Sequence, residues 1–313
     1  MPRARFLLRH TGGILGFFDW LFGLFQTRTE SREPADGTRD VSELARRLGV
    51  TEEDLRSARP AYKEFGLPKR SGGTRTIASP EPALKALQRR VLRRVLARLR
   101  CHPAATGFEK HYSIAINALA HVHKAVVVRM DILNFFGSIK ADRVQRYFQG
   151  VGWNAEAARL LTGICTYGGA LPQGAPTSPR LSNLLSCRLD ARLNALAKRY
   201  GATYSRYADD MTFSWDANVS LNVHAVIRLT KLILSDEGYE IHSRKKLHVS
   251  RRHDRQIVTG LVVNERVNLP RETRRRLRAI GHHHRIGRPA TLTPAQLAGW
   301  HAIEAMIKKQ TSR

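Results

Sequence analysis

The sequence predicts an α+β fold, and three observations support this class. Residues 125–130 form an apolar run that is typical of a buried strand. Residues 203–207 and 211–215 are rich in Thr, Tyr, Phe and Trp and flank a tight turn, which predicts a β-hairpin. Residues 84–100 carry apolar side chains at three- and four-residue spacing, which predicts an amphipathic helix. A chain of 313 residues can bury a full core, as one large domain or as two to three subdomains.

The chain is strongly basic, with 53 Lys and Arg against 26 Asp and Glu and a formal net charge of +27. Self-repulsion on this scale is tolerated most easily when a polyanion binds, so nucleic acid is the leading partner and a membrane surface the second. A hydrophobic content of 42% excludes a disordered chain. Three widely spaced cysteines without a zinc-binding pattern favour reduced thiols in a cytoplasmic protein.

Residues 1–40 are expected to form an N-terminal apolar segment and a linker. Residues 13–25 are apolar apart from Asp19, and they are too few to span a bilayer, which takes about 20 residues. Asp19 and the lack of a small-residue cleavage site argue against a cleaved signal peptide. We expect an amphipathic helix that packs on the body or on a partner, with a membrane-surface anchor as the alternative.

The other elements follow in order along the chain. Residues 42–57 predict two short helices, the second capped by Thr51. Gly72 and Gly73 lie between basic segments, which predicts a hairpin within residues 67–80. Further helices are expected at residues 84–100, 155–166, 179–200, 222–237 and 271–285, and a further strand at residues 257–263.

The C-terminal part carries the densest positive charge, since residues 244–288 contain fourteen Lys and Arg and three acids. Helical spacing over residues 271–285 places five cations on one face: Arg271, Arg275, Arg278, His282 and Arg285. Charge of a single sign favours a phosphate-facing surface over a merely solvated one. The run His282-His283-His284 permits a metal site, but in so basic a helix we favour phosphate or base contacts.

Three carboxylates stand out in this basic chain. Asp209 and Asp210 lie side by side at the predicted hairpin turn, where like charges repel and a cation is expected to neutralise them. Taken alone, the pair would indicate a solvated acidic turn. Asp131 changes this interpretation because it ends the predicted buried strand. Carboxylates at such positions are ligands for magnesium, which also takes waters and substrate phosphates.

Several blocks of the sequence resemble reverse transcriptases. Residues 128–139 (VRMDILNFFGSI) resemble the first palm block of that family, residues 171–179 (LPQGAPTSP) its Leu-Pro-Gln-Gly block, and residues 204–210 (YSRYADD) its Tyr-x-Asp-Asp hairpin. Asn134 is a departure, because the first block often has a second Asp there. Residues 117–121 (NALAH) and 258–260 (VTG) match signatures of bacterial retron reverse transcriptases. The resemblance covers about residues 41–300.

The resemblance implies a right-hand polymerase. The fingers would span residues 41–123, the palm residues 124–260 and the basic helical thumb residues 261–313. The palm sheet would be antiparallel with helices on one face.

The resemblance also implies a site that transfers nucleotides with two Mg²⁺ ions, for which Mn²⁺ could substitute. Its metal ligands would be Asp131, Asp209, Asp210 and the backbone carbonyl of Ile132. Phe136 would block the 2′-hydroxyl of a ribonucleotide, and Gln173 would lie near the sugar. Arg75 and Lys69 would grip the triphosphate, and Lys245 would serve as general acid, although Arg244 and Lys246 leave its register open. Asn117 and His121 would contact RNA, with a structural role as the alternative for His121.

The implied function is that of a retron reverse transcriptase. Such an enzyme uses dNTPs to copy part of a cognate structured non-coding RNA into branched RNA–DNA, and acts with an accessory effector protein in anti-phage defence. Two alternatives stay open: another bacterial defence-type reverse transcriptase, and a non-catalytic RNA-binding module that kept the polymerase fold. The sequence leaves the oligomeric state open.

Overall fold

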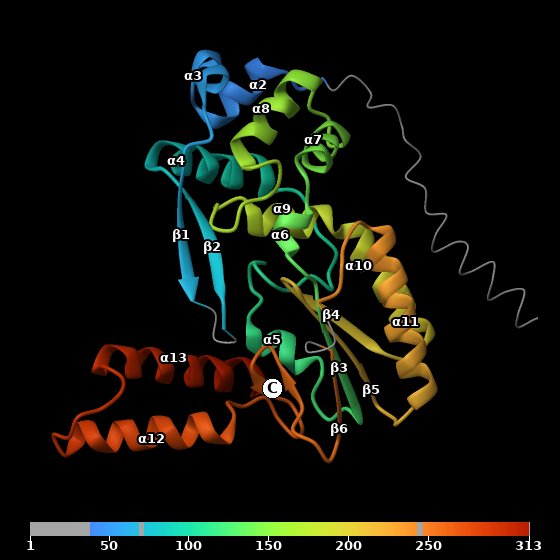
Figure 1. The fold of residues 1–313 in the computed structure, drawn as a ribbon, viewed down its shortest axis with the longest axis vertical. Coiled ribbons are helices and arrows are strands. Elements are labelled where there is room, and N and C mark those ends of the chain that lie inside the picture. Colours follow the sequence, from blue (N-terminus) through green and yellow to red (C-terminus); the bar gives the residue numbers. More distant parts are fainter. Residues whose placement is uncertain (1–37, 69–71, 243–246, 313) are drawn as a thin grey trace, which may run out of the picture.

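The computed structural model describes residues 38–68, 72–242 and 247–312, and the fold is mixed α and β as predicted (Figure 1). The predicted N-terminal helix at residues 13–25 lies outside the described residues, as do Lys69 and Lys245 with its neighbours Arg244 and Lys246. Among the described residues, no helix is both long and apolar enough to cross a bilayer.

Two short helices, α2 (Val41–Leu48) and α3 (Glu52–Ser57), stand at one end of the molecule (Figure 1). The predicted cap of α3 at Thr51 is confirmed, and it is a full capping box, because the side chains and backbone amides of Thr51 and Asp54 bond to each other. Helix α2 is capped by the side chain of Asp40, so it begins one residue before the predicted range. Its buried residues join the larger of two hydrophobic clusters.

The hairpin predicted within residues 67–80 is present but begins five residues earlier, as β1 (Tyr62–Pro68) and β2 (Thr74–Pro80). The two strands pair antiparallel and lie below helix α4 (Pro82–Val91) in Figure 1. The helix predicted over residues 84–100 ends early, because Leu92–Leu96 form a π-helical turn. Val91, Val95 and Leu96 are all buried. All three side chains join the larger hydrophobic cluster, so the π-helical turn keeps this segment packed on the core.

The central sheet has four strands in the order β4-β5-β3-β6, and every neighbouring pair is antiparallel. The strands are β3 (Val126–Asp131), β4 (Thr203–Tyr207), β5 (Asp210–Trp215) and β6 (His248–Arg251), of which the last was not predicted. Because side chains alternate along a strand, Val126 and Val128 enter the larger cluster whereas Val127 enters the smaller one. The sheet therefore separates two cores.

Helices α10 (Cys187–Arg199) and α11 (Ser220–Asp236) cover the face of the sheet that holds the larger cluster (Figure 1). The helix predicted over residues 179–200 is interrupted at Ser186, which separates α9 (Ser178–Leu185) from α10. The Ser186 hydroxyl bonds to the Tyr239 hydroxyl at 2.8 Å, so the break is held by a buried contact. Near α9 lie α6 (Phe135–Ser138) and α7 (Ala141–Gly150), and α8 (Ala155–Cys165) packs on α7.

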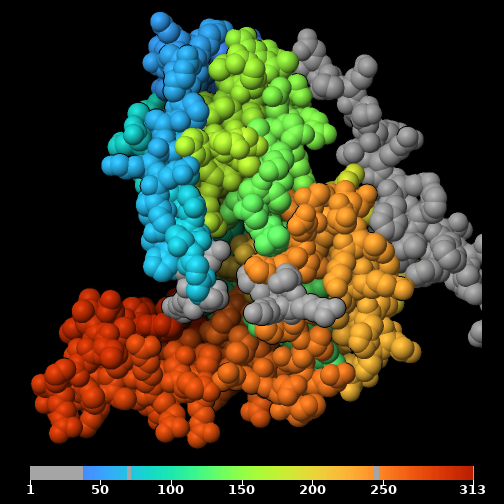
Figure 2. Space-filling model, viewed as in Figure 1, coloured from blue at the N-terminus to red at the C-terminus, as the bar shows by residue number. Residues whose placement is uncertain are grey.

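The other face of the sheet is covered by α5 (Ile114–Leu119), which precedes the residues predicted as palm. There it joins α12 (Arg271–Arg285) and α13 (Pro294–Thr311), which lie at the end of the molecule opposite α2 and α3 (Figures 1 and 2). The strand predicted over residues 257–263 is a small hairpin, β7 (Ile257–Val258) and β8 (Leu261–Val262). Thr259 and Gly260 have φ of 47° and 81°, as a tight turn with two left-handed residues requires.

Candidate active site

The sheet brings the three predicted carboxylates to one edge. Asp131 ends β3 and Asp210 begins β5, and the two residues are direct partners in the antiparallel register. Their side chains leave the same face of the sheet, because residues opposite each other in a ladder do so. Asp209 precedes Asp210 in the turn, and its carbonyl accepts a hydrogen bond of 2.9 Å from the backbone N–H of Ile132. All three carboxylates are half-buried.

The turn between β4 and β5 has an unusual backbone. Tyr207 and Asp210 close it, leaving Ala208 and Asp209 as its two central residues. Ala208 has φ of 58°, a left-handed conformation that favours glycine over a residue with a side chain. Gly107 packs directly behind it, since a Cβ on Gly107 would lie 2.6 Å from the Ala208 nitrogen. The carboxylates thus sit on a strained turn that surrounding structure must hold.

The loop with Gln173 meets the strand with Arg75. The backbone N–H of Ala78 on β2 donates to the carbonyl of Gln173 at 2.9 Å. Gly174 has φ of 134°, and a Cβ there would lie 2.5 Å from the Ala78 carbonyl oxygen. Arg75 is exposed, three residues before Ala78 on the same strand. One predicted nucleotide-binding residue, Gln173, therefore contacts the strand that carries another, Arg75.

Aromatic rings connect Phe136 to the acidic turn. The Phe136 ring centroid lies 5.7 Å from that of Phe135 and 6.2 Å from that of Phe108, which in turn lies 6.3 Å from that of Tyr207. Sequence reasoning missed Phe108, which is 46% exposed and has φ of 64°. Its signal is an exposed aromatic ring on a left-handed backbone, and both properties become visible only in three dimensions.

Asn117 and His121, which were predicted to contact RNA, are both buried among protein groups in this structure. The Asn117 side-chain oxygen accepts from the hydroxyl of Thr106 at 2.7 Å. The two ring nitrogens of His121 lie 2.7 Å from the hydroxyls of Ser205 and Ser214, on β4 and β5. These contacts fasten α5 and its preceding loop to the back of the β4–β5 hairpin, in keeping with the structural alternative for His121.

Burial, and then the positive charge of Lys124, lower the pKa of His121 to about 3. In the unfolded chain its pKa returns to about 6.5, so the unfolded state binds one more proton between these values. The stabilisation is complete above pH 6.5 and is lost as the pH falls toward 3. We expect the free energy of unfolding to fall by about 1.4 kcal/mol per pH unit below pH 6.5 from this residue alone.

Denaturant titrations between pH 6.5 and 5, above the range where most carboxylates titrate, measure this slope. His121→Gln stays neutral throughout and should show a flatter profile by that amount. His102, whose pKa is also lowered by burial, contributes equally to both proteins. Identical slopes in parent and variant would contradict the assignment.

The predicted cationic face of α12 is exposed: Arg271, Arg275, Arg278 and His282 all reach the surface. The other two histidines of the run are engaged locally. His283 bonds through Nδ1 to the Pro289 carbonyl at 3.0 Å, and His284 through Nε2 to the Leu292 carbonyl at 2.8 Å. These contacts tie α12 to the loop before α13 and do not bring the three histidines together on a metal.

The carboxylates suit a metal that is shared with substrate. Within residues 38–68, 72–242 and 247–312, no group of three or more His, Cys, Asp or Glu side chains is arranged to hold a metal by itself. Magnesium in nucleotide-transfer sites uses one or two carboxylates and takes its other ligands from waters and substrate phosphates. The paired ends of β3 and β5 supply hard oxygen ligands of this kind, so the residues fit such an ion.

Comparison with known proteins agrees with this geometry. The family model for reverse transcriptase (RNA-dependent DNA polymerase) matches residues 67–283, which include all three carboxylates. The chain belongs to the reverse transcriptase family. Family membership assigns the polymerase fold to this mixed α and β structure and an RNA-directed DNA polymerase activity that uses divalent metal ions.

Its curated relatives are retron enzymes. This reverse transcriptase is 38% identical to the Retron Mx162 reverse transcriptase and 36% identical to the Retron Mx65 reverse transcriptase, both of Myxococcus xanthus. It is 37% identical to the Retron Ec86 reverse transcriptase of Escherichia coli. These matches cover 83%, 90% and 76% of this chain and 62%, 75% and 73% of the respective relatives. The retron assignment made from residues 117–121 and 258–260 is confirmed.

Proposed function

We propose that this retron reverse transcriptase copies part of a cognate structured non-coding RNA into DNA that stays linked to the RNA. The paired placement of Asp131 and Asp210 at the sheet edge, in a chain related to retron enzymes, carries the proposal. A purely RNA-binding module would not need three carboxylates at one edge of a protein with a net charge of +27, because they would repel the RNA.

Asp131, Asp209 and Asp210, with the backbone carbonyl of Ile132, are the residues that would hold two Mg²⁺ ions, or Mn²⁺ in their place. When bound, such ions stabilise the charge on the attacking and leaving oxygens of phosphoryl transfer. The protein holds the carboxylates in place through the sheet register and the Ile132 to Asp209 backbone bond. Because the carboxylates are already in place, no free energy is needed to bring these like charges together during the reaction.

The incoming dNTP would bind where β2 meets the 171–178 loop. Arg75 suits the triphosphate because its planar guanidinium forms paired bonds with phosphate oxygens. Gln173 would lie beside the sugar, and Phe136 would exclude a 2′-hydroxyl. Lys69, as a second triphosphate contact, and Lys245, as a general acid, complete the proposal from outside the described residues.

We assign fingers to residues 41–123, palm to residues 124–260 and thumb to residues 261–313. The separation of the two hydrophobic clusters supports the last boundary, since most of the smaller cluster comes from residues 258–307. Free Cys101, Cys165 and Cys187 suit the cytoplasm, where thiols stay reduced.

The exposed arginines of α12 would contact the phosphates of the RNA. Replacing Arg271, Arg275 and Arg278 with Ala should weaken RNA binding and flatten its salt dependence, since each lost phosphate contact lowers the logarithmic slope by about one unit. Binding titrations at several salt concentrations measure the slope. Adding Arg285→Ala, on the same face, should lower the slope further. An unchanged slope in the triple variant would mean that this face does not bind RNA.

Expression of the chain together with its flanking DNA tests the proposed function. RNA-linked single-stranded DNA should appear in the nucleic acid of those cells and should disappear with Asp209→Asn. DNA synthesis without an RNA link would favour another defence-type reverse transcriptase. Protection against phage that requires a neighbouring open reading frame would support an effector partner.

A further inference from the structure

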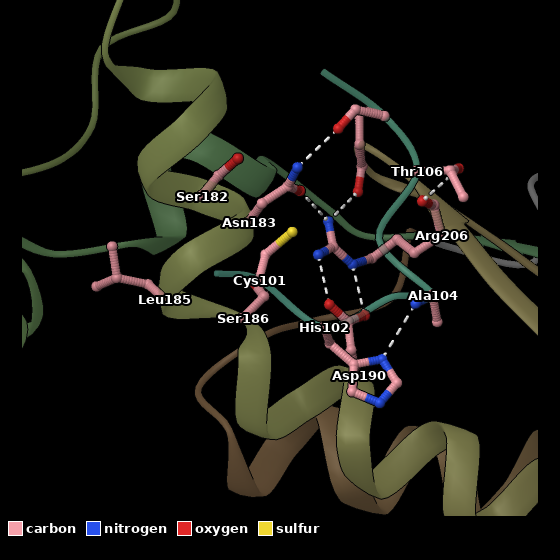
Figure 3. A network of polar contacts seen from close by, with 12 residues as sticks. Cys101, His102, Ala104, Thr106, Ser182, Asn183, Leu185, Ser186, Asp190 and Arg206 are labelled. Atoms are coloured by element: carbon pink, nitrogen blue, oxygen red, sulfur yellow. Dashed lines mark hydrogen bonds and ion pairs between the residues drawn. The ribbon is translucent and has the colours of Figure 1, made fainter. Parts of the chain in front are cut away.

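The underside of the acidic turn is built around one buried arginine. Arg206 on β4 is fully buried, and its Nε and Nη2 donate to the two carboxylate oxygens of Asp190 on α10 at 2.8 and 2.6 Å (Figure 3). Its third nitrogen, Nη1, donates to the carbonyl of Ala208 at 2.9 Å. Arg206 therefore connects helix α10 directly to the strained residue that precedes Asp209.

Asn183 on α9 fastens the same turn from a second direction. Its Oδ1 accepts from Arg206 Nη1 at 3.2 Å, and its Nδ2 donates to the carbonyl of Gly107 at 2.6 Å (Figure 3). Gly107 is the residue whose backbone packs behind Ala208. Asn183 Nδ2 also donates to Glu109 at 2.9 Å, and Arg180 of α9 is ion-paired with that carboxylate. Both sides of the turn are thus anchored to rigid helices.

A buried ion pair is a costly way to fill space at this position. Removing Arg206 and Asp190 from water carries a large desolvation penalty, and apolar residues of similar volume often stabilise a core equally well or better. The guanidinium does what an apolar side chain cannot, because its rigid fork reaches a carboxylate and a backbone carbonyl at once. The stacking of Arg206 Cζ at 5.3 Å from the Phe135 ring centroid fixes its plane further.

We propose that Arg206, clamped by Asp190 and Asn183, is a positioning residue that fixes the turn bearing Asp209 and Asp210 for metal binding. The inference rests on the proposed metal site. A shorter or differently shaped cation would keep a charge in the cavity but would lose the Ala208 carbonyl. The turn would then sample other conformations, and Asp209 would lose its fixed place at the Ile132 backbone.

The test compares Arg206→Lys with Arg192→Lys. Arg192 is also nearly buried on the same side of the sheet and is ion-paired with Asp236 and Glu237, away from the hairpin. Arg206→Lys should speed hydrogen exchange of the amides of residues 207–210 at least tenfold and weaken Mn²⁺ binding, followed by electron paramagnetic resonance. It should raise the Mg²⁺ concentration for half-maximal DNA synthesis by about 10- to 100-fold, since a misplacement of about 1 Å costs on this order. Arg192→Lys should lower the melting temperature without these changes.

Asn183→Ser is the second variant and serves if Arg206→Lys fails to fold. It keeps the Arg206–Asp190 ion pair and removes only the amide contacts. It should produce the same pattern at smaller size. The proposal would be overturned if Arg206→Lys or Asn183→Ser showed the same metal dependence, and the same amide exchange at residues 207–210, as the control Arg192→Lys. A failure of the metal site itself is distinguishable, because Asp209→Asn would then keep parental activity in the same assay.

Discussion

Asp209→Asn should reduce DNA synthesis by a factor on the order of 10³, the size of effect seen when one preorganised electrostatic contact to a transition state is lost. The amide keeps the shape of the side chain but loses the charge that a divalent cation requires. The fold should tolerate the change, because removing one of two adjacent like charges relieves repulsion. Single-turnover primer extension on an RNA template, with thermal unfolding of the same preparation, measures both quantities.

Asp216→Asn is the matched control, since it removes a carboxylate just beyond the other end of β5. Asp216 is exposed and ion-paired with Lys124. An exposed pair contributes at most about 1 kcal/mol to stability, and its loss should leave the rate of synthesis unchanged. Equal activity of Asp209→Asn and the parent would show that the turn does not bind the metal. A large loss in Asp216→Asn would show that the assay reports folding and not catalysis.

Gly174→Ala should have the second-largest effect, because it forces apart two parts of the proposed nucleotide site. The new Cβ would lie 2.5 Å from the Ala78 carbonyl oxygen and 3.0 Å from a methyl carbon of Ile77, on a backbone with φ of 134°. Backbone atoms cannot move aside as a flexible side chain can. We expect the loop to separate from β2 and the KM for dNTPs to rise by about 10²-fold, with a smaller loss in kcat.

Gly163→Ala serves as the control for a glycine change as such. Gly163 is exposed within α8, and a Cβ there would meet no atom within 4 Å. Alanine favours a helix over glycine by about 1 kcal/mol, so this variant should be slightly more stable and fully active. A parental KM for Gly174→Ala would show that the loop and β2 can part without consequence for nucleotide binding.

Local patterns in the sequence predicted those parts of the fold that depend on neighbouring residues. The apolar run before Asp131, the Thr51 cap and the glycine pair at Gly72 and Gly73 each specify a nearby strand, helix or turn. The paired acids at Asp209 and Asp210 likewise indicated a turn, and they became a candidate metal site only together with Asp131. These patterns predict structure correctly because the interactions that cause them join residues close together in the sequence.

Contacts between distant segments could not be predicted in this way. Asp190 looks like an ordinary exposed charge of an amphipathic helix until β4 brings Arg206 beneath it, sixteen residues later. Gly107 shows its role only against Ala208, and Asn117 only against Thr106. The family resemblance predicted that Asn117 and His121 contact RNA. A family signature indicates which residues are important, but the contacts that they make depend on their burial.

Strand β3 has a consequence for how this molecule could come apart. Val126 and Val128 are buried in one cluster, and Val127 between them is buried in the other. Loosening of the smaller cluster would release α12 and α13 while Val126 and Val128 stay enclosed. The segment that ends in Asp131 is thus shared by two cooperative units, and should be the last to exchange its amide protons whichever unit opens first.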